Sequence, residues 1–207
     1  MTPENFSATH SNKTSAKALR NTLREKRRQL TASDQEQHST SICQTIIDST
    51  EYQDAQHIAL YLSADGEVDL EPLLRHIALD GKYAYLPVIL DKTQGMMAFA
   101  AYGEQTVLKK NNFGILEPEY QDSQLKSAQQ LDLVLAPLVA FDDLGNRLGM
   151  GGGFYDRALQ HMQANSAEKP IFMGIAHALQ KVTQLESQAW DIKLNGIVTE
   201  KAYSKFL

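Results

Sequence analysis

Residues 131–162, with the sequence LDLVLAPLVAFDDLGNRLGMGGGFYDRALQHM, combine the signals that decide the fold of this chain. Residues 131–139 are almost continuously apolar, as expected for a strand that is buried on both faces of a sheet. A glycine-rich loop follows at residues 145–153, and residues 154–162 then place apolar side chains on one side of a helix. A buried strand that leads through a loop into an amphipathic helix is typical of α/β proteins with a parallel sheet.

The rest of the chain continues this alternation of strands and helices. Strands are predicted at residues 57–62, 83–89, 96–102, 171–176 and 196–199. Helices are predicted at residues 13–30, 33–49 and 70–78, the second opened by a capping box of Ser33 and Glu36 and the third closed by Gly81. We therefore predict an α/β fold of three layers, in which helices cover both faces of a mostly parallel, Rossmann-like sheet, with an N-terminal helical extension. We expect a disordered tail at residues 1–12 and a single domain at residues 13–207.

Composition excludes several classes of protein. Apolar residues make up 43% and charged residues 22% of the 207 residues, the balance of a globular protein with a proper core. The single cysteine, Cys43, excludes an internal disulfide and a cysteine-rich zinc site. The net charge of -5 argues against a global basic field for nucleic acid, and no apolar run is long enough to span a membrane or to act as a secretory signal. We expect a cytoplasmic protein.

The glycine-rich loop is the strongest functional signal, because five of the 12 glycines fall within residues 145–153. Such a cluster is entropically costly unless the backbone itself is needed, for example to approach a ligand closely. Before a helix, the loop predicts a cradle for an anion such as a nucleotide phosphate, to which Arg147 adds a fork of donors. The alternative is a flexible surface loop. The P-loop motif is absent, and the dinucleotide motif fails because Phe154 replaces its third glycine.

Other charged residues allow two interpretations each. Asp156, in the first turn of the predicted helix, either complements the helix dipole or binds magnesium beside a bound triphosphate. Asp191 alone would be interpreted as a surface acid. The predicted N-terminal helix carries a basic run that is either a solvated face or a set of phosphate contacts. This run consists of Lys17, Arg20, Arg24, Lys26, Arg27 and Arg28. We interpret His57, His76 and His177 as packing or surface residues.

The segment Phe141-Asp142-x-x-Gly145-Asn146-Arg147-Leu148-Gly149-x-Gly151-Gly152-Gly153-Phe154-Tyr155-Asp156-Arg157 closely resembles the signature loop of the 5-formyltetrahydrofolate cyclo-ligase family. Three further segments resemble family motifs, namely Tyr61-Leu62-Ser63 with Glu67-Val68-Asp69, Phe113-Gly114-Ile115-x-Glu117-Pro118, and Ile197-Val198-Thr199-Glu200. The resemblance extends in order over residues 16–200.

The resemblance implies a ligase that forms a carbon–nitrogen bond. With ATP as co-substrate and Mg²⁺ as cofactor, such an enzyme closes 5-formyltetrahydrofolate to 5,10-methenyltetrahydrofolate and releases ADP and phosphate. The expected partners are ATP and 5-formyltetrahydrofolate, with or without a polyglutamate tail. We expect neither nucleic acid nor a membrane as a partner. We expect a monomer.

The resemblance further assigns residues to three sites. The ATP site would consist of Lys17, Arg20, Arg147, Leu148, Gly149, Met150, Gly151, Gly152, Gly153, Phe154 and Tyr155. The folate site would consist of Leu62, Glu67, Met150, Gly151, Gly152, Gly153 and Phe154. Asp156 and Asp191 would hold magnesium.

The sequence departs from the family pattern at a few positions. Ala16 stands where the family usually has lysine, Met150 and Phe154 where tyrosine is frequent, and Trp190 where histidine is common. An alternative hypothesis is therefore a non-catalytic relative that binds RNA through the basic N-terminal helix, against which the acids Glu67, Asp156 and Asp191 argue. A further alternative is a sugar-phosphate isomerase or an acyl-transfer enzyme on a similar sheet.

Overall fold

The central strand of the molecule is buried on both faces, as its apolar sequence predicts. The computed structural model describes residues 5–110, 116–163 and 170–206, and for residues 5–14 the backbone alone. In β6 (Leu133–Pro137), Leu133 and Leu135 face one hydrophobic core, whereas Val134 and Ala136 face the other. None of these four residues is exposed to solvent. Two cores separated by one sheet define a protein of three layers.

Around β6 the described part of the chain forms strands and helices in alternation. The helices are α1 (Asn5–Arg28), α2 (Ala32–Ile47), α3 (Thr50–Asp54), α4 (Glu71–Leu79) and α5 (Phe154–Ala158). The other strands are β1 (His57–Ala59), β2 (Tyr83–Asp91), β3 (Met96–Tyr102), β4 (Leu108–Lys110), β5 (Leu116–Pro118), β7 (Ala140–Phe141), β8 (Arg147–Leu148), β9 (Ile171–Ile175), β10 (Gly196–Val198) and β11 (Tyr203–Lys205). Short 3₁₀ helices include η3 (Gln160–Gln163) and η4 (Ala178–Gln180).

The main sheet has seven strands in the order β11-β10-β9-β6-β1-β2-β3. The five strands from β10 to β2 are parallel, and the edge strands β11 and β3 are antiparallel to their neighbours. The register pairs Ile58 of β1 with Leu133 of β6, and Val134 of β6 with Phe172 of β9. The mostly parallel sheet is confirmed. All five parallel strands direct their carboxyl ends to the same edge, where α/β proteins bind their ligands.

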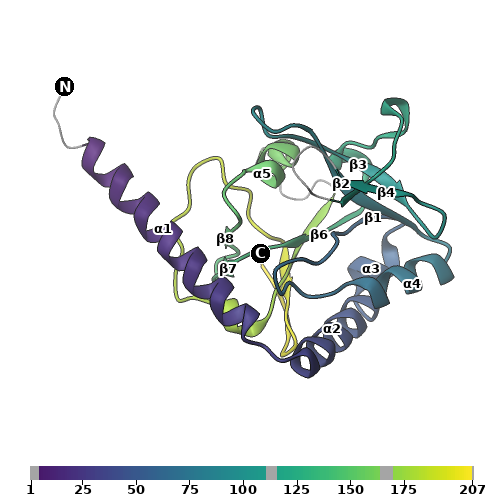
Figure 1. Ribbon diagram of the computed structural model, residues 1–207, viewed down its shortest axis with the longest axis horizontal. Helices are drawn as coiled ribbons and strands as arrows, with labels where there is room; N and C mark the ends of the chain where they lie inside the picture. Colours follow the sequence, from purple (N-terminus) through teal and green to yellow (C-terminus); the bar gives the residue numbers. More distant parts are fainter. Residues whose placement is uncertain (1–4, 111–115, 164–169, 207) are drawn as a thin grey trace.

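Helices cover both faces of this sheet, as predicted. Figure 1 shows α2, α3 and α4 on one side of it and α5 on the other. On the first side, Ile42 and Ile46 of α2 and Leu73 and Ile77 of α4 belong to one core with the strands. On the second side, Leu159 and the residues around α5 and η3 cover the other core.

The ends of the helices differ from the sequence predictions. The capping box of α2 is formed by Thr31 and Asp34 instead of Ser33 and Glu36, because the extended Thr31 accepts the N–H of Asp34 and its own N–H reaches the Asp34 carboxylate, both at 3.1 Å. The helix predicted at residues 154–162 ends at Ala158 and continues as 3₁₀ turns. Gly81, with φ +67°, follows α4 as predicted.

The helical extension α1 begins at Asn5, earlier than the predicted Lys13, and its first turns project beyond the rest of the molecule (Figure 1). Its second half packs on the β7–β8 hairpin, where Leu19 and Leu23 meet Val139, Ala140 and Leu148. This packing brings α1 to the loop that follows β8. The division of the chain at residue 12 stays a prediction. Across the described ranges, no helix combines the length with the apolar character that crossing a bilayer requires.

Candidate functional site

The glycine-rich loop lies between β8 and α5, at the carboxyl edge of the sheet. The N–H of Val139 donates to the Leu148 carbonyl at 2.7 Å, which closes the β7–β8 hairpin and fixes where the loop starts. Gly151 and Gly153 have φ values of +99° and +66°, which glycine adopts without strain. A Cβ on Gly152 would come within 2.6 Å of the Phe154 ring. Three glycines in sequence are therefore required by backbone conformation and by space. Met150, Gly151 and Gly152 are exposed, so the loop backbone faces solvent.

Arg20 of α1 reaches this loop from 129 residues away in the sequence. Its Nε donates to the Gly149 carbonyl at 2.7 Å, and its guanidinium lies beside Gly151. Partial burial lowers the pKa of Arg20, but an arginine still carries its charge at neutral pH. Lys17, one turn earlier in α1, is exposed. The structure thus places a half-buried cation against an exposed glycine backbone. A helix of five residues has only a weak dipole, so the positive charge at this loop comes mainly from side chains.

Arg147, in contrast, is held inside the protein. Its side chain is only 7% exposed, and its guanidinium lies 4.7 Å from the centre of the Phe172 ring. Nη1 donates to the Ile192 carbonyl at 2.9 Å, and Nη2 donates to Asp156 at 2.8 Å. These contacts orient the Asp156 carboxylate. A phosphate contact of Arg147 stays a prediction.

Of the two acids predicted to hold magnesium, Asp156 contacts the backbone of the residue that follows the other, Asp191. Asp156 Oδ1 accepts the backbone N–H of Ile192 at 3.1 Å, and Asp191 is the preceding residue. The Asp191 carboxylate accepts the N–H of Gln188 at 2.8 Å, which stabilises the turn before Ile192. Although 35 residues separate the two acids in sequence, the backbone next to Asp191 therefore contacts the Asp156 carboxylate at the start of α5.

The loop after β1 makes a tight turn at residues 64–67, with the N–H of Glu67 donating to the Ala64 carbonyl at 2.9 Å. Among the described residues, Asp65 is the one non-glycine residue in the left-handed region, with φ +55°. Gly66 follows with φ +76°. Such a conformation costs a non-glycine residue about 1 kcal/mol or more and persists only where its surroundings enforce it.

Three arginines of α1 enforce this turn. The Asp65 carboxylate accepts from Arg24 at 2.6 Å, from Arg28 at 2.5 Å and from Arg27 at 3.1 Å. Arg27 also donates to the backbone carbonyls of Asp65, at 3.0 Å, and Leu138, at 3.3 Å. Although burial acts to raise the pKa of Asp65, the hydrogen bonds from Arg24 and Arg28 hold it below its usual range.

The interpretation of the whole basic run as a solvated face is wrong for Arg27, whose side chain is 1% exposed. The signal was present in the sequence, because Leu19, Leu23 and Arg27 recur every four residues and so share one face of α1. We call Arg24, Arg27, Arg28 and Asp65 the arginine clamp.

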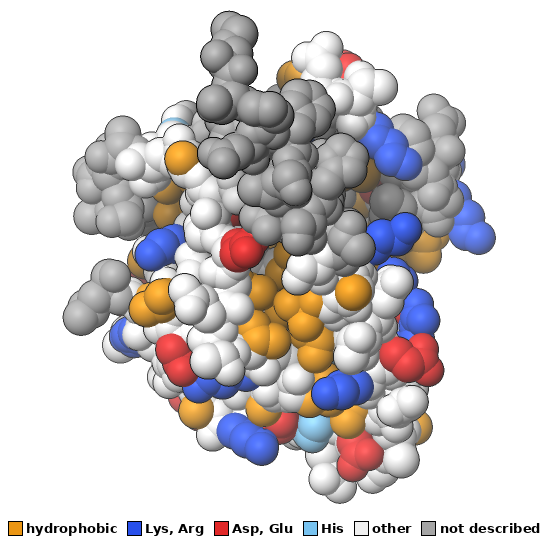
Figure 2. Space-filling view, turned by 90° about the vertical axis from the view of Figure 1, so that its left-hand side faces the viewer, with side chains coloured by type: hydrophobic (Ala, Val, Ile, Leu, Met, Phe, Trp, Pro, Cys, Tyr) orange, Lys and Arg blue, Asp and Glu red, His pale blue; other side chains and the backbone are white. Residues whose placement is uncertain are grey.

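Figure 2 shows Lys and Arg side chains interspersed with Asp, Glu and a central group of hydrophobic side chains, instead of a continuous basic surface. The pairing within the clamp and this mixed surface argue against RNA binding by α1.

Glu67, the acid predicted to contact folate, lies beside the arginine clamp. Its side chain is 15% exposed, with Oε1 3.7 Å from Arg27 and Oε2 accepting the Ala64 N–H at 3.2 Å. Burial raises the pKa of Glu67, and the charge of Arg27 opposes part of this rise. Burial and the negative charge of Glu67 raise the pKa of Tyr155, a first-turn residue of α5. Leu62 lies exposed before the same turn.

Sequence reasoning assigned no role to Asp142 and Asn146, which build the turn before the glycine loop. Asp142 is fully buried and accepts the N–H groups of Leu144, Asn146 and Leu185 at 2.9–3.1 Å, together with the Asn146 side-chain amide. Burial acts to raise the pKa of Asp142, but these hydrogen bonds lower it below its usual value. Within the described residues, Asn146 Oδ1 is the buried side-chain atom without a partner. The signal was the Asp-x-x-x-Asn spacing inside the signature segment.

The central motif of the resemblance lies partly outside the described residues, because 113–115 are among the residues without a description. Its Glu117 is buried and accepts the N–H of Ile89 at 2.9 Å, so this acid joins β5 to β2. Its role in this structure is to attach the two-stranded β4–β5 sheet to the main sheet.

Fold and site define a class: a three-layer α/β protein that gathers a glycine loop, an arginine and several carboxylates at the carboxyl edge of its parallel sheet. The chain belongs to the 5-formyltetrahydrofolate cyclo-ligase family, whose sequence model matches residues 12–200.

Individual relatives agree with this assignment. The chain is 40% identical over 180 residues to the 5-formyltetrahydrofolate cyclo-ligase of Haemophilus influenzae, with 87% of this chain and 95% of the relative covered. It is 38% identical over 177 residues to the enzyme of that name from Escherichia coli K12, with 86% and 96% covered. The solved structure of 5,10-methenyltetrahydrofolate synthetase from Aquifex aeolicus is similar with a TM-score of 0.77 at 29% identity, with 92% of both chains covered.

Proposed function

We propose that this chain catalyses the ATP-dependent closure of 5-formyltetrahydrofolate to 5,10-methenyltetrahydrofolate at the carboxyl edge of its sheet. The observation that carries the proposal is that α1 contacts two distant segments. Arg20 binds the glycine loop that leads to Asp156, and Arg27, two turns further along α1, binds the turn that carries Glu67. Family membership supports the activity, and this convergence supports the location of the site.

The chemistry requires activation of a poor leaving group. The formyl oxygen first takes the γ-phosphoryl group of ATP, which releases ADP. The neighbouring amine nitrogen of the folate then attacks the activated carbon and gives up its proton to solvent or to the departing phosphate, while the carbon–oxygen bond breaks and phosphate leaves. A protein contributes to such a transfer mainly by positioning the reactants and neutralising charge.

We assign the ATP phosphates to the exposed glycine loop, residues 149–153. Its main-chain N–H groups can approach phosphate oxygens because no side chain intervenes at three consecutive positions. Arg20 supplies a cation that is already anchored on the Gly149 carbonyl, and Lys17 adds a second cation on the same side of α1. Leu148, Met150, Phe154, Tyr155 and Arg147 complete the proposed ATP site.

The residues at the start of α5 suit magnesium. Asp156 and Asp191 offer carboxylate oxygens, which are the ligands that Mg²⁺ prefers beside phosphate. When bound there, the cation would neutralise charge on the β- and γ-phosphates. Both contacts that hold Asp156 use Oδ1, which leaves the second oxygen as its donor to a cation. The role of Arg147 is then to keep this carboxylate in place.

We assign the pterin end of the folate to Glu67 and Leu62, opposite the loop residues Met150 to Phe154. A carboxylate can accept the N–H groups of a pterin ring as a charge-assisted pair. The arginine clamp fixes the turn from which Glu67 projects, so its arginines are positioning residues. We expect the protein to act as a monomer in the cytoplasm.

The proposal is tested by following the absorbance of the methenyl product with purified protein and 5-formyltetrahydrofolate. Product should form when ATP and magnesium are both present and should be absent when either is omitted. Formation of no product at saturating concentrations of all three would overturn the proposal. Turnover without ATP would point to an isomerase or an acyl-transfer enzyme instead.

A further inference from the structure

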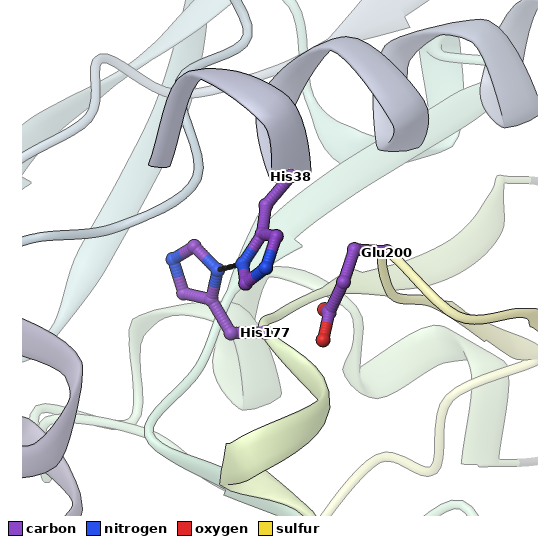
Figure 3. Close-up of side chains that lie close together, drawn as sticks. All are labelled: His38, His177 and Glu200. Carbon is purple, nitrogen blue, oxygen red and sulfur yellow. Dashed lines mark hydrogen bonds between the residues drawn. The ribbon is translucent and has the colours of Figure 1, made fainter. Parts of the chain in front are cut away.

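A second group of chemically active side chains lies next to the turn 64–67. His38 of α2, His177 at the start of η4, and Glu200 after β10 converge from three distant parts of the sequence (Figure 3). One nitrogen of each imidazole and one oxygen of the carboxylate all lie within 4.8 Å of one another. The cyclo-ligase reaction, as proposed above, uses none of these three residues.

The orientation of His177 leaves one nitrogen lone pair directed at His38. His177 is fully buried, and its Nε2 lies 3.1 Å from the Gly66 carbonyl. A carbonyl only accepts hydrogen bonds, so Nε2 carries the proton and Nδ1 carries the lone pair. Nδ1 lies 2.9 Å from Nδ1 of His38. Histidines that bind metals are typically held by such a bond from the other ring nitrogen to a carbonyl or a carboxylate.

Glu200 is also held in place by the backbone. Its Oε2 accepts the N–H of Ala178 at 2.8 Å, which fixes the carboxylate beside the residue that follows His177. Glu200 and His38 are both half-buried, so the cluster is accessible from solvent while one of its members is completely enclosed. Two of the three donors are thus oriented before any ligand arrives.

We propose that His38, His177 and Glu200 form a binding site for a divalent transition-metal cation, with zinc as the best match. Two imidazoles and one carboxylate are a donor set of zinc sites that keep a fourth position for water. Zinc–nitrogen bonds of about 2.0–2.1 Å at tetrahedral angles separate the two nitrogens by roughly 3.3 Å. The observed 2.9 Å therefore requires a shift of only a few tenths of an ångström. Magnesium prefers oxygen donors, which separates this site from the one at Asp156.

The proton balance of binding follows from the hydrogen-bonded histidine pair. Without a cation, the Nδ1 atoms share one proton, donated by His38 because His177 Nδ1 carries the lone pair. The cation takes the place of this proton, which leaves to solvent or moves to His38 Nε2. A bound cation would join α2, η4 and the chain after β10. It would also stiffen His177, whose other nitrogen holds the Gly66 carbonyl beside Glu67.

The test is a titration of the tag-free, metal-free protein with Co²⁺, a spectroscopic substitute for zinc, followed by competition with Zn²⁺. We expect saturable binding of one cation per chain, visible absorption typical of tetrahedral cobalt, and its loss when zinc is added. Zinc should also raise the Tm of the protein, because it binds the folded chain preferentially.

Two variants and one control connect the binding to this cluster. His38→Ala and Glu200→Gln should each weaken cation binding at least tenfold and reduce the rise in Tm. His76→Ala removes an exposed histidine of α4 and should leave both readouts unchanged. If one cluster variant fails to fold, the other still gives the result.

Three outcomes would overturn the proposal. The first is no saturable binding at all. The second is equal binding by the wild type and by Glu200→Gln and His38→Ala. The third is a loss of affinity that is as large in His76→Ala as in the cluster variants, which would indicate scattered surface histidines. The proposal would also fail if His38→Ala lowers the Tm and added cations do not change the Tm of either protein. The hydrogen bond between His38 and His177 would then be purely structural.

Discussion

Two segments at the carboxyl edge of the sheet adopt left-handed backbone conformations in opposite ways. The loop at residues 149–153 uses glycine at its left-handed positions and lies largely exposed, and its carbonyls accept from two arginines, Arg20 and Arg157. The turn at residues 64–67 places Asp65 in a left-handed position and holds it with the arginine clamp. The exposed backbone of residues 149–153 is accessible to a ligand, whereas the backbone of residues 64–67 is fixed by hydrogen bonds that orient the side chain of Glu67. We infer that the glycine loop serves ATP and that the clamped turn serves the folate.

The largest effect is expected at the acid that follows the glycine loop. Asp156→Asn should lower kcat by about a hundredfold or more while the fold and Tm stay close to wild type, because an amide does not neutralise a magnesium ion. Steady-state kinetics and circular dichroism check both parts. Asp143→Asn, at an exposed acid of the neighbouring hairpin, is the matched control and should keep full activity. Activity of Asp156→Asn within about threefold of wild type would remove Asp156 from the metal site.

A substitution within the glycine loop should have the second largest effect. In Gly152→Val the new side chain collides with the Phe154 ring and fills space that the phosphates need, so the ATP KM should rise, or kcat fall, by more than about tenfold. Expressed as free energy, the loss of stability should be smaller than the loss of activity. Gly103→Ala is the control, because a Cβ at that exposed position meets nothing within 4 Å. Unchanged ATP kinetics in Gly152→Val would move the phosphate site away from the loop.

Removing the cation at the loop should have a similar or slightly smaller effect. Arg20→Ala loses a charge-assisted contact of about 1.5–3 kcal/mol, which corresponds to a rise of roughly tenfold or more in ATP KM, or an equal fall in kcat. Arg75→Ala, at an exposed arginine of α4, should leave the kinetics unaltered. An ATP KM and a kcat that stay at their wild-type values in Arg20→Ala would mean that α1 only packs against the loop.

The clamped turn should respond in stability and in folate binding. Arg27→Met removes buried hydrogen bonds to Asp65 and Leu138, so the free energy of unfolding should fall by about 2 kcal/mol. The folate KM should rise about fivefold, corresponding to roughly 1 kcal/mol. Arg28→Met, in the same clamp but half exposed, should cost less than about 1 kcal/mol. Equal losses from Arg27→Met and Arg28→Met would contradict the central role of the buried arginine.

The smallest effect is a shift in pH dependence. Because the pKa of Glu67 is raised in the folded protein, its carboxylate should take up a proton above the usual range of a glutamate, near 4.3. The folate KM should therefore rise as the pH falls through this raised pKa, and the Glu67→Gln variant should lack this dependence. The folded state binds the proton of Glu67 more tightly than the unfolded state does. The free energy of unfolding should therefore decrease as the pH rises between the pKa of Glu67 in the unfolded state and its higher pKa in the folded state. A midpoint in the wild type at or below the usual range would contradict the burial of Glu67.

Local signals in the sequence were sufficient to predict much of the fold. The apolar run at residues 131–139 indicated a strand with two buried faces, and the structure divides its side chains between two cores. The positions of β2, β3, β9 and β10 follow from similar runs. The start of α2 could not be predicted in this way, because Thr31 and Ser33 are both good caps and only the backbone conformation at Thr31 distinguishes them.

The candidate site was predicted where its chemistry is local and missed where it depends on long-range packing. The glycine loop and Asp156 lie within one segment, so their spacing could be interpreted directly. Neither interpretation of the basic run predicted the buried position of Arg27, because its partners, Asp65 and Leu138, are 38 and 111 residues away. Asp142 stabilises its own turn but also Leu185, which only the folded chain brings within reach.

The most direct test of the division between the two segments is one set of initial rates of methenyl product formation. ATP and 5-formyltetrahydrofolate are each varied in turn, with wild type, Arg20→Ala and Arg27→Met measured under the same conditions. We predict that Arg20→Ala changes the ATP dependence while the folate KM stays within about twofold, and that Arg27→Met does the reverse. A parallel rise of both KM values in both variants would contradict the account, because the loop and the clamped turn would then act as one unit.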